Sequence, residues 1–173
     1  GTGDVNKDGL EDFYIGGSTG YSGKLFVQQK EGDFKETNQK LWENEKIYED
    51  MGILFFDADG DKDDDLYIVS GSNEFPENSP YYQDRLYIND GKGNFVKSVD
   101  ALPVMNSSKS CVRANDFDGD GDPDLFVGGR SVPGKYPFSP RSYILRNSKG
   151  KFTDDTKVLS LELMNPGMVT DAV

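Results

Sequence analysis

The sequence contains no histidine, and this absence excludes several kinds of chemistry. Without imidazole there is no Ser-His-Asp or Cys-His nucleophile system, no histidine general base and no zinc site built on histidine. The single cysteine, Cys111, has no partner for an internal disulfide, and its apolar neighbour Val112 indicates a buried thiol. No apolar run approaches the roughly 20 residues that a membrane-spanning helix needs.

Hydrophobic residues are also scarce, at 35% of 173 residues, whereas the chain holds 20 glycines and 8 prolines. This composition favours many short strands joined by turns, and the length suffices for one domain with a sizeable core. An aromatic content of 12% argues against disorder. No signal peptide is visible, and the opening "GTGDVNKDG" is interpreted as a processing boundary, so the missing signal does not decide secretion.

The net charge of −12 comes almost entirely from three stretches of nine residues. Residues 4–12, 57–65 and 116–124 hold 15 of the 31 acidic residues and only 2 basic ones, so the remaining chain is nearly neutral. A generally solvated acidic surface would spread this charge more evenly. Because a phosphate backbone requires a concentrated basic face, nucleic acid is not an expected partner.

The three acidic stretches align without gaps and mark an internal repeat. They read "DVNKDGLEDFYIGG" from Asp4, "DADGDKDDDLYIVSG" from Asp57 and "DFDGDGDPDLFVGG" from Asp116, and each runs into apolar residues. An apolar element also precedes the second and third stretches, as "GILFF" and "CVRAN". The apolar elements on both sides are interpreted as strands A and B of each repeat.

A second shared pattern lies downstream, at residues 24–34, 85–95 and 142–152. An apolar triplet is followed by a polar turn with glycine and then by phenylalanine, which is typical of a β-hairpin. Gly32, Gly93 and Gly150 occupy the turn, where a positive φ is expected. The hairpin supplies strands C and D, so a complete repeat has four short antiparallel strands. Only "GTG" precedes the first acidic loop, so no strand A is expected in the first repeat.

This organisation predicts an all-β fold made of β-propeller blades, with repeats over about residues 1–50, 51–108 and 109–166 and a fourth starting at 167–173. The alternative, an antiparallel sandwich of about twelve strands, gives no reason for the turns to repeat. About three blades are too few to close a ring, since propellers typically use at least four. The sequence therefore indicates a partial propeller, as a fragment of a larger one or as a chain that self-associates through exposed blade edges. In the second case the strand at 168–172 would complete the partner's first blade.

The acidic loops have the spacing of a calcium site. Calcium takes six to eight oxygens, and a loop with side-chain ligands at positions 1, 3, 5 and 9 and a backbone carbonyl at position 7 can wrap the ion. The candidate ligands are Asp4, Asn6, Asp8, Leu10, Asp12, Asp57, Asp59, Asp61, Asp63, Asp65, Asp116, Asp118, Asp120, Asp122 and Asp124. About three calcium ions per chain would lower the net charge from −12 to about −6. Magnesium suits the loops less well, because it keeps its waters and demands octahedral geometry.

Two other interpretations of these loops fit the sequence less well. A solvated Asp-rich turn explains one such loop, but three aligned loops that each end in an apolar strand argue against it. An EF-hand needs glutamate at position 12 and flanking helices. Position 12 here is Ile15, Ile68 or Val127, within strand-like residues, which argues against a helix-flanked calcium sensor. Position 6 is glycine in two loops but Lys62 in the middle one.

The loop pattern D-x-[DN]-x-D-x-x-x-D running into an apolar strand resembles the FG-GAP/VCBS repeat family, which includes the integrin α-subunit propeller and many bacterial surface and secreted proteins. The stretch "FVGGRSVPGKYPFSPRSYILRN" is most similar to bacterial VCBS proteins related to the cartilage acidic protein and ASPIC/UnbV group. The resemblance implies a seven-bladed propeller, calcium in the A–B loops, an extracytoplasmic location and a role in adhesion or ligand binding. The chain departs from the family's name motif, with "YIGG", "IVSG" and "FVGG" in its place.

Recognition is expected in the long B–C connections at 70–84 and 128–141, which are rich in proline and aromatic residues. The candidate ligand-binding residues are Phe75, Tyr81, Tyr82, Arg130, Tyr136 and Arg141. They would form an aromatic and cationic surface for a protein or glycan, or the rings would instead staple their own loops. The lone tryptophan, Trp42, is predicted to anchor the core between blades.

We therefore expect a calcium-binding, non-catalytic module for protein or glycan binding, located outside the cell, at its surface or in the periplasm. Extracellular calcium sites have dissociation constants of about 10⁻⁴–10⁻³ M and would be mostly empty in a cytosol. The alternative is part of a carbohydrate-active enzyme similar to a polysaccharide lyase, with Lys135, Tyr136 or Arg141 in acid/base and charge-stabilising roles.

Overall fold

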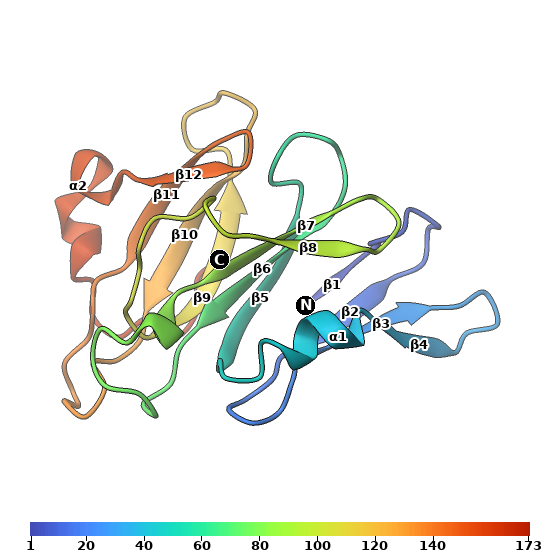
Figure 1. Ribbon diagram of the computed structural model, residues 1–173. Helices are drawn as coiled ribbons and strands as arrows, with labels where there is room; N and C mark the ends of the chain where they lie inside the picture. Colours follow the sequence, from blue (N-terminus) through green and yellow to red (C-terminus); the bar gives the residue numbers. More distant parts are fainter.

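The computed structural model describes residues 1–173 and contains three four-stranded antiparallel sheets that stand side by side in chain order (Figure 1). The first sheet consists of β1 (Thr2–Gly3), β2 (Asp12–Ile15), β3 (Lys24–Gln28) and β4 (Phe34–Thr37). The second consists of β5 (Asp50–Phe56), β6 (Asp65–Ser70), β7 (Arg85–Asn89) and β8 (Phe95–Ser98). The third consists of β9 (Lys109–Asn115), β10 (Asp124–Gly129), β11 (Tyr143–Ser148) and β12 (Lys151–Asp154). Each sheet is a simple meander, so the expected all-β fold with three propeller-type blades is confirmed.

The chain has four short helical segments. Two lie between strands, α1 (Gln39–Glu43) and η1 (Pro80–Tyr82), and two follow the last strand, α2 (Thr156–Leu159) and η2 (Leu161–Met164). None has the length and apolar character needed to cross a bilayer. Helix α1 places Trp42 between the first two sheets, where the side chain is 1% exposed. Its ring lies 5.0 Å from that of Tyr14 and 5.1 Å from that of Tyr87, so the expected core role of the tryptophan is confirmed.

The two ends of the chain differ from the simplest expectation. The sequence indicates no strand A for the first repeat within residues 1–3. In the structure, however, β1 pairs Thr2 with Phe13 and gives the first sheet its fourth strand. Residues 167–173 form no strand within this chain. The Val169 amide instead donates to the Gly129 carbonyl at 2.9 Å, which places this segment against the third sheet. Whether it begins a fourth repeat stays a prediction.

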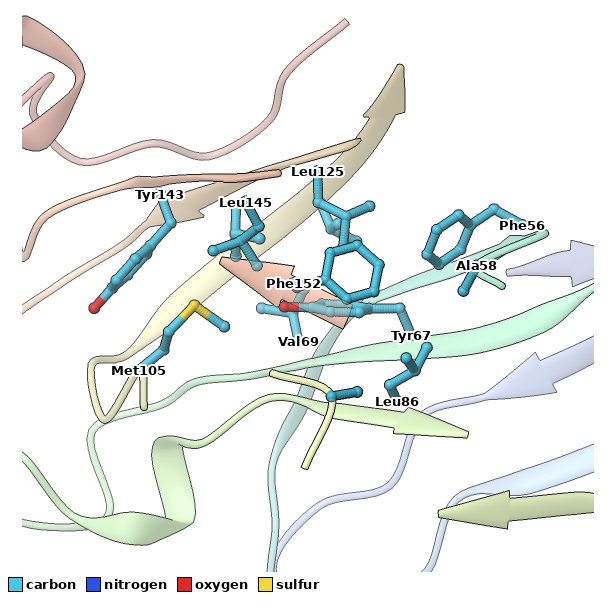
Figure 2. Close-up of a cluster of buried hydrophobic side chains, with 13 residues drawn as sticks. Phe56, Ala58, Tyr67, Val69, Leu86, Met105, Leu125, Tyr143, Leu145 and Phe152 are labelled. Atoms are coloured by element: carbon cyan, nitrogen blue, oxygen red, sulfur yellow. The ribbon is translucent and has the colours of Figure 1, made fainter. Parts of the chain in front are cut away.

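Two apolar clusters fill the spaces between neighbouring sheets, because β6 is buried on both faces. Leu66 and Ile68 point toward the first sheet, whereas Tyr67 and Val69 point toward the third. The cluster between the second and third sheets includes Phe56, Tyr67, Val69, Leu86, Met105, Leu125, Tyr143, Leu145 and Phe152 (Figure 2). Burial of these side chains is the main force that holds successive blades together.

A buried ion pair crosses the junction between the second and third sheets. Lys109, the first residue of β9, lies 3.3 Å from the carboxylate of Asp84, and both side chains are fully buried. The Lys109 ammonium also donates to three backbone carbonyls, those of Tyr82 at 2.6 Å, Met105 at 2.7 Å and Ser107 at 2.6 Å. Asp84 accepts from the Tyr67 hydroxyl at 2.8 Å and from the Ser70 amide at 2.7 Å. Each buried charge therefore has a partner of opposite sign, and the hydrogen bonds of Lys109 and Asp84 offset the cost of burying them.

At the junction between the first and second sheets, the position equivalent to Lys109 holds a residue of opposite charge, Asp50. Asp50 opens β5 and pairs with Ser70, as Lys109 opens β9 and pairs with Gly129. Asp50 accepts from the Gly17 amide at 2.7 Å and from the Tyr14 hydroxyl at 3.2 Å, and it forms an ion pair with Arg85. The first sheet has no carboxylate equivalent to Asp84, because Gly23 precedes β3 there. A Cβ at Gly23 would lie 1.9 Å from the Tyr14 hydroxyl, so Asp50 supplies the acceptor from the next blade.

Both outermost faces of the array carry apolar groups. On the first sheet the Phe13 ring lies 5.1 Å from that of Phe26 and 4.9 Å from that of Phe34. On the third sheet an apolar cavity of about 490 Å³ lies over Phe126 and Ile144. Self-association through these blades stays a prediction. Cys111 is buried, as expected.

Candidate metal centres

The three acidic loops connect β1 to β2, β5 to β6 and β9 to β10, and they fold in the same way. In each loop the first aspartate accepts the amide of the sixth residue, which is Gly9 at 2.9 Å, Lys62 at 3.0 Å and Gly121 at 3.0 Å. The aspartate at position 5 accepts the amide of position 7 at 2.9 Å in every loop. These bonds turn the side chains of positions 1, 3 and 5 toward one side of the loop.

Two of the loops gather carboxylates closely enough to share a metal ion. Asp57, Asp59 and Asp61 form one triad, and Asp116, Asp118 and Asp120 form the other; within each, one oxygen per residue lies within 4.8 Å of the others. Two oxygens bound to one calcium ion at about 2.3–2.6 Å can be separated by at most about 5.2 Å, so both triads fit one ion. An all-oxygen donor set also suits a hard cation.

The first loop has the same backbone but only two carboxylates in this triad. Asn6 stands at position 3, and its side-chain oxygen accepts the Asp8 amide at 3.1 Å. Its amide nitrogen donates to the Asp8 carboxylate at 3.0 Å. Asp4 accepts the amides of Asp8 and Gly9 at 3.1 and 2.9 Å. The loop thus keeps the arrangement of the other two with one negative charge fewer.

The backbone explains where glycine is used in these loops. The residue at position 6 has a positive φ in all three: 83° at Gly9, 69° at Lys62 and 96° at Gly121. Only glycine adopts this region without steric cost. Lys62 therefore takes the same conformation as the glycines rather than a different loop shape.

The aspartate at position 9 is buried, and each of its two oxygens accepts one backbone amide, an arrangement called the clasp below. Asp65 accepts the Ala58 amide at 2.9 Å on one oxygen and the Asn89 amide at 2.8 Å on the other. Asp12 and Asp124 form the equivalent pairs of bonds in their own repeats, at 2.7–3.0 Å. Each clasp ties the start of an acidic loop to strand C of the same sheet. Whether these oxygens also ligate a metal ion stays a prediction.

Burial sets the electrostatics of this clasp. It raises the pKa of Asp65 to about 7, against the opposing effect of the amides of Asn89 and Ala58. Burial likewise raises the pKa of Asp12, although the Gln28 and Val5 amides lower it. In the metal-free loop, ionisation of these carboxyls is therefore costly.

The side chains at position 7 are used outside the triads. Asp63 forms an ion pair with Lys7 of the first loop, and Asp122 accepts the Lys149 amide at 3.0 Å. Leu10 has no polar side-chain atom to offer. This supports the expectation that position 7 contributes its backbone carbonyl.

Two asparagines that were not among the candidate residues join the first and second acidic loops to the blade that follows each of them. The Asn89 side-chain amide donates to the Val5 carbonyl at 2.8 Å, and that of Asn147 donates to the Ala58 carbonyl at 2.8 Å. The third hairpin is one residue shorter, so Asn147 rather than Arg146 is the equivalent of Asn89. The signal in the sequence was an asparagine directly before each polar turn, as in "YIND" and "LRNS".

We expect Asp65→Asn to lower the free energy of unfolding of the calcium-free chain by about 1–3 kcal/mol, because an amide side chain accepts only one of the two buried backbone bonds. The measurement is urea unfolding in the presence of a chelator. Asp61→Asn is the matched control: it lies in the exposed part of the same loop and should change stability by less than about 0.5 kcal/mol. Equal losses in the two variants would contradict the clasp.

The candidate recognition residues divide into two groups. Phe75, Tyr81 and Tyr82 pack on one another, with the Phe75 ring 4.7 Å from that of Tyr81 and 6.0 Å from that of Tyr82. These contacts are the ones expected if the rings hold their own loop in place, which is the alternative interpretation. Tyr136 is 81% exposed, whereas Arg141 stacks on the Tyr143 ring at 4.4 Å. The Arg130 backbone amide donates to the Ser108 carbonyl at 3.0 Å. Whether the six residues bind a ligand stays a prediction.

The fold and the loops together define a propeller-type repeat protein with Asp-rich loops that could hold metal ions. The family model for the FG-GAP-like repeat matches residues 4–68 and 57–127. These matches span most of the chain and contain all three acidic loops, and the chain therefore belongs to the FG-GAP-like repeat family. A comparison with curated proteins found no match.

Proposed function

We propose that the chain is a calcium-binding, non-catalytic module that acts outside the cytosol and binds a protein or glycan. The observation that carries this proposal is the convergence of carboxylates in the two triads, Asp57/Asp59/Asp61 and Asp116/Asp118/Asp120. Like charges held this close repel one another, and a divalent cation relieves that repulsion. The first loop, with the same hydrogen bonds, provides a third and weaker site.

An extracellular, cell-surface or periplasmic location follows from the chemistry of calcium. Exposed loops of this kind bind calcium with dissociation constants of about 10⁻⁴–10⁻³ M, which match free calcium outside cells. The acidic loops and the long B–C loops lie at opposite ends of the sheets, because strand B runs from one to the other. In this proposal the metal holds the blades at one end while recognition, including adhesion, uses the other end.

The geometry of the candidate catalytic residues supports a binding role over an enzymatic one. Lys135 pairs with Glu77, and Arg141 pairs with Asp154 at 2.8 Å, so both cations are already neutralised. Tyr136 extends into solvent. These ion pairs and the exposure of Tyr136 favour a binding role over acid/base chemistry at these residues.

Calcium titration by calorimetry tests the metal part of this proposal. We expect three calcium ions per chain with dissociation constants of about 10⁻⁴–10⁻³ M, and weaker binding of magnesium. Asp120→Ala removes the position-5 ligand of the third loop and should reduce the stoichiometry by one ion. Binding of no calcium, or of magnesium with equal affinity, would refute the calcium assignment.

A further inference from the structure

A polar cleft lies between the two long loops, at the end of the sheets opposite the acidic loops. It is walled by residues 77–82 of the loop after β6, residues 131–141 of the loop after β10 and residues 106–108 before β9, and its volume is about 250 Å³. Only two of its thirteen lining residues are hydrophobic. The cleft therefore lacks the apolar pocket that an anchoring side chain of a peptide requires.

The walls of the cleft are held in place by contacts within and between the loops. The Tyr82 hydroxyl donates to the Phe75 carbonyl at 2.6 Å and accepts the Phe75 amide at 3.0 Å. Lys135 forms an ion pair with Glu77 from one loop to the other. Pro133 in the cleft wall has a fixed φ. A site that is formed before the ligand arrives loses less entropy on binding.

The charged residues in the cleft are already neutralised. The Arg141 guanidinium lies 2.8 Å from one carboxylate oxygen of Asp154 and 3.0 Å from the other, and it stacks on the Tyr143 ring. Glu77 is paired with Lys135. With no free charge to attract an ion, the cleft suits a neutral ligand.

One buried hydroxyl in the cleft wall lacks a hydrogen-bond partner. Ser108 is 1% exposed, and its Oγ is bonded to no other group. A buried hydroxyl without a partner is costly, so its position in a cleft wall points to a ligand that completes it. Other hydroxyl and amide side chains line the same cleft: Asn78, Asn106, Ser107, Ser139 and Asn165. These groups both donate and accept, as the hydroxyls of a sugar do.

We propose that this cleft binds one neutral monosaccharide unit of a glycan, with Ser108 Oγ hydrogen-bonded to a sugar hydroxyl. The inference rests on the binding role proposed above and names its ligand class and its site. The cleft is slightly smaller than the roughly 300–1,000 Å³ of pockets for drug-sized ligands, which suits a single sugar ring.

Saturation-transfer NMR on the full chain in calcium tests this site. The probes are glucose, galactose, mannose and fucose, with glucuronate, glucosamine and a pool of tripeptides as comparisons. We expect saturation transfer to at least one neutral sugar, a loss of that signal in Ser139→Tyr, and about tenfold weaker binding in Ser108→Ala. Ser148→Tyr is the matched control, because Ser148 is exposed at the end of β11 outside the cleft, and it should bind like the unmodified chain.

Three results would overturn the inference: no signal from any neutral sugar, a signal that survives Ser139→Tyr, or a signal only from the charged sugars or the peptides. The calcium titration is a separate readout. Failure of sugar binding with three calcium ions bound refutes the cleft assignment alone. Sugar binding in a chain that takes up no calcium refutes the metal assignment alone.

Discussion

Calcium is expected to raise the melting temperature of the chain strongly. A ligand that binds only the native state adds RT ln(1 + [L]/Kd) per site, about 2.7 kcal/mol at a hundredfold excess over Kd. Three sites therefore add up to about 8 kcal/mol at about 10 mM calcium if each has a Kd near 10⁻⁴ M. For a chain of this size each kcal/mol corresponds to about 2–4 °C, so the rise should exceed about 15 °C. Thermal melts with calcium, with magnesium and with a chelator measure it.

Variants of single loops show whether the effect belongs to the acidic loops. Asp120→Ala should remove about one third of the calcium-induced stabilisation and leave the melt in chelator nearly unchanged, because Asp120 is exposed. Lys62→Ala in the middle loop keeps all of the loop's carboxylates and should keep most of the response. An unchanged calcium response in Asp120→Ala would mean that calcium binds elsewhere.

Replacing Lys109 by methionine should destabilise the fold by about 3–5 kcal/mol, since removing one member of a buried ion pair leaves the other charge unpaired. Three carbonyls would lose their donor at the same time. Burial already raises the pKa of Asp84, and Lys109 is the main group that opposes this rise. Without Lys109 the pKa of Asp84 in the folded variant rises further above its value in the unfolded chain. Between these two values the folded state therefore binds more protons than the unfolded state. Its stability should therefore fall as the pH rises from about 4 toward neutrality.

Urea unfolding at pH 5 and pH 8 measures both parts of this prediction. Lys97→Met is the control, because Lys97 pairs with Glu45 at 2.8 Å near the surface and such pairs contribute at most about 1 kcal/mol. Adding Asp84→Asn to Lys109→Met should recover part of the loss and abolish the pH dependence. A cost below about 1 kcal/mol for Lys109→Met would show that the cation does not anchor the junction.

The blade architecture could be predicted because its signals are local and repeated. Gly32, Gly93 and Gly150 have φ of 90°, 78° and 81°, as the hairpin pattern required. Ile15 and Ile68 lie in strands, as the argument against an EF-hand expected. Each of these features depends on neighbours within a few residues, which a sequence displays directly.

What could not be predicted depends on burial. Asp57 and Asp65 look alike in the sequence, but one lies in a triad and the other is a buried acceptor of two amides. Lys109 stands in the polar run "NSSKS", which is typical of an exposed turn, and yet it is fully buried. Lys109 is buried because β9 lies beside the second sheet, and this neighbourhood cannot be read from the residues around it. The polar cleft likewise depends on two loops that lie far apart in the chain.

The charge reversal between the two junctions bears on how such a chain can evolve. Blades that meet only through apolar side chains could be duplicated or exchanged in any order. If the middle blade were duplicated, Asp50 of the added copy would take the place of Lys109 beside Asp84 of the original blade. Two carboxylates would then share one buried site. Moving the third blade beside the first would leave Lys109 facing Gly23, with no acid to meet it. Exchanging or duplicating blades would therefore require a compensating change of charge at the new junction.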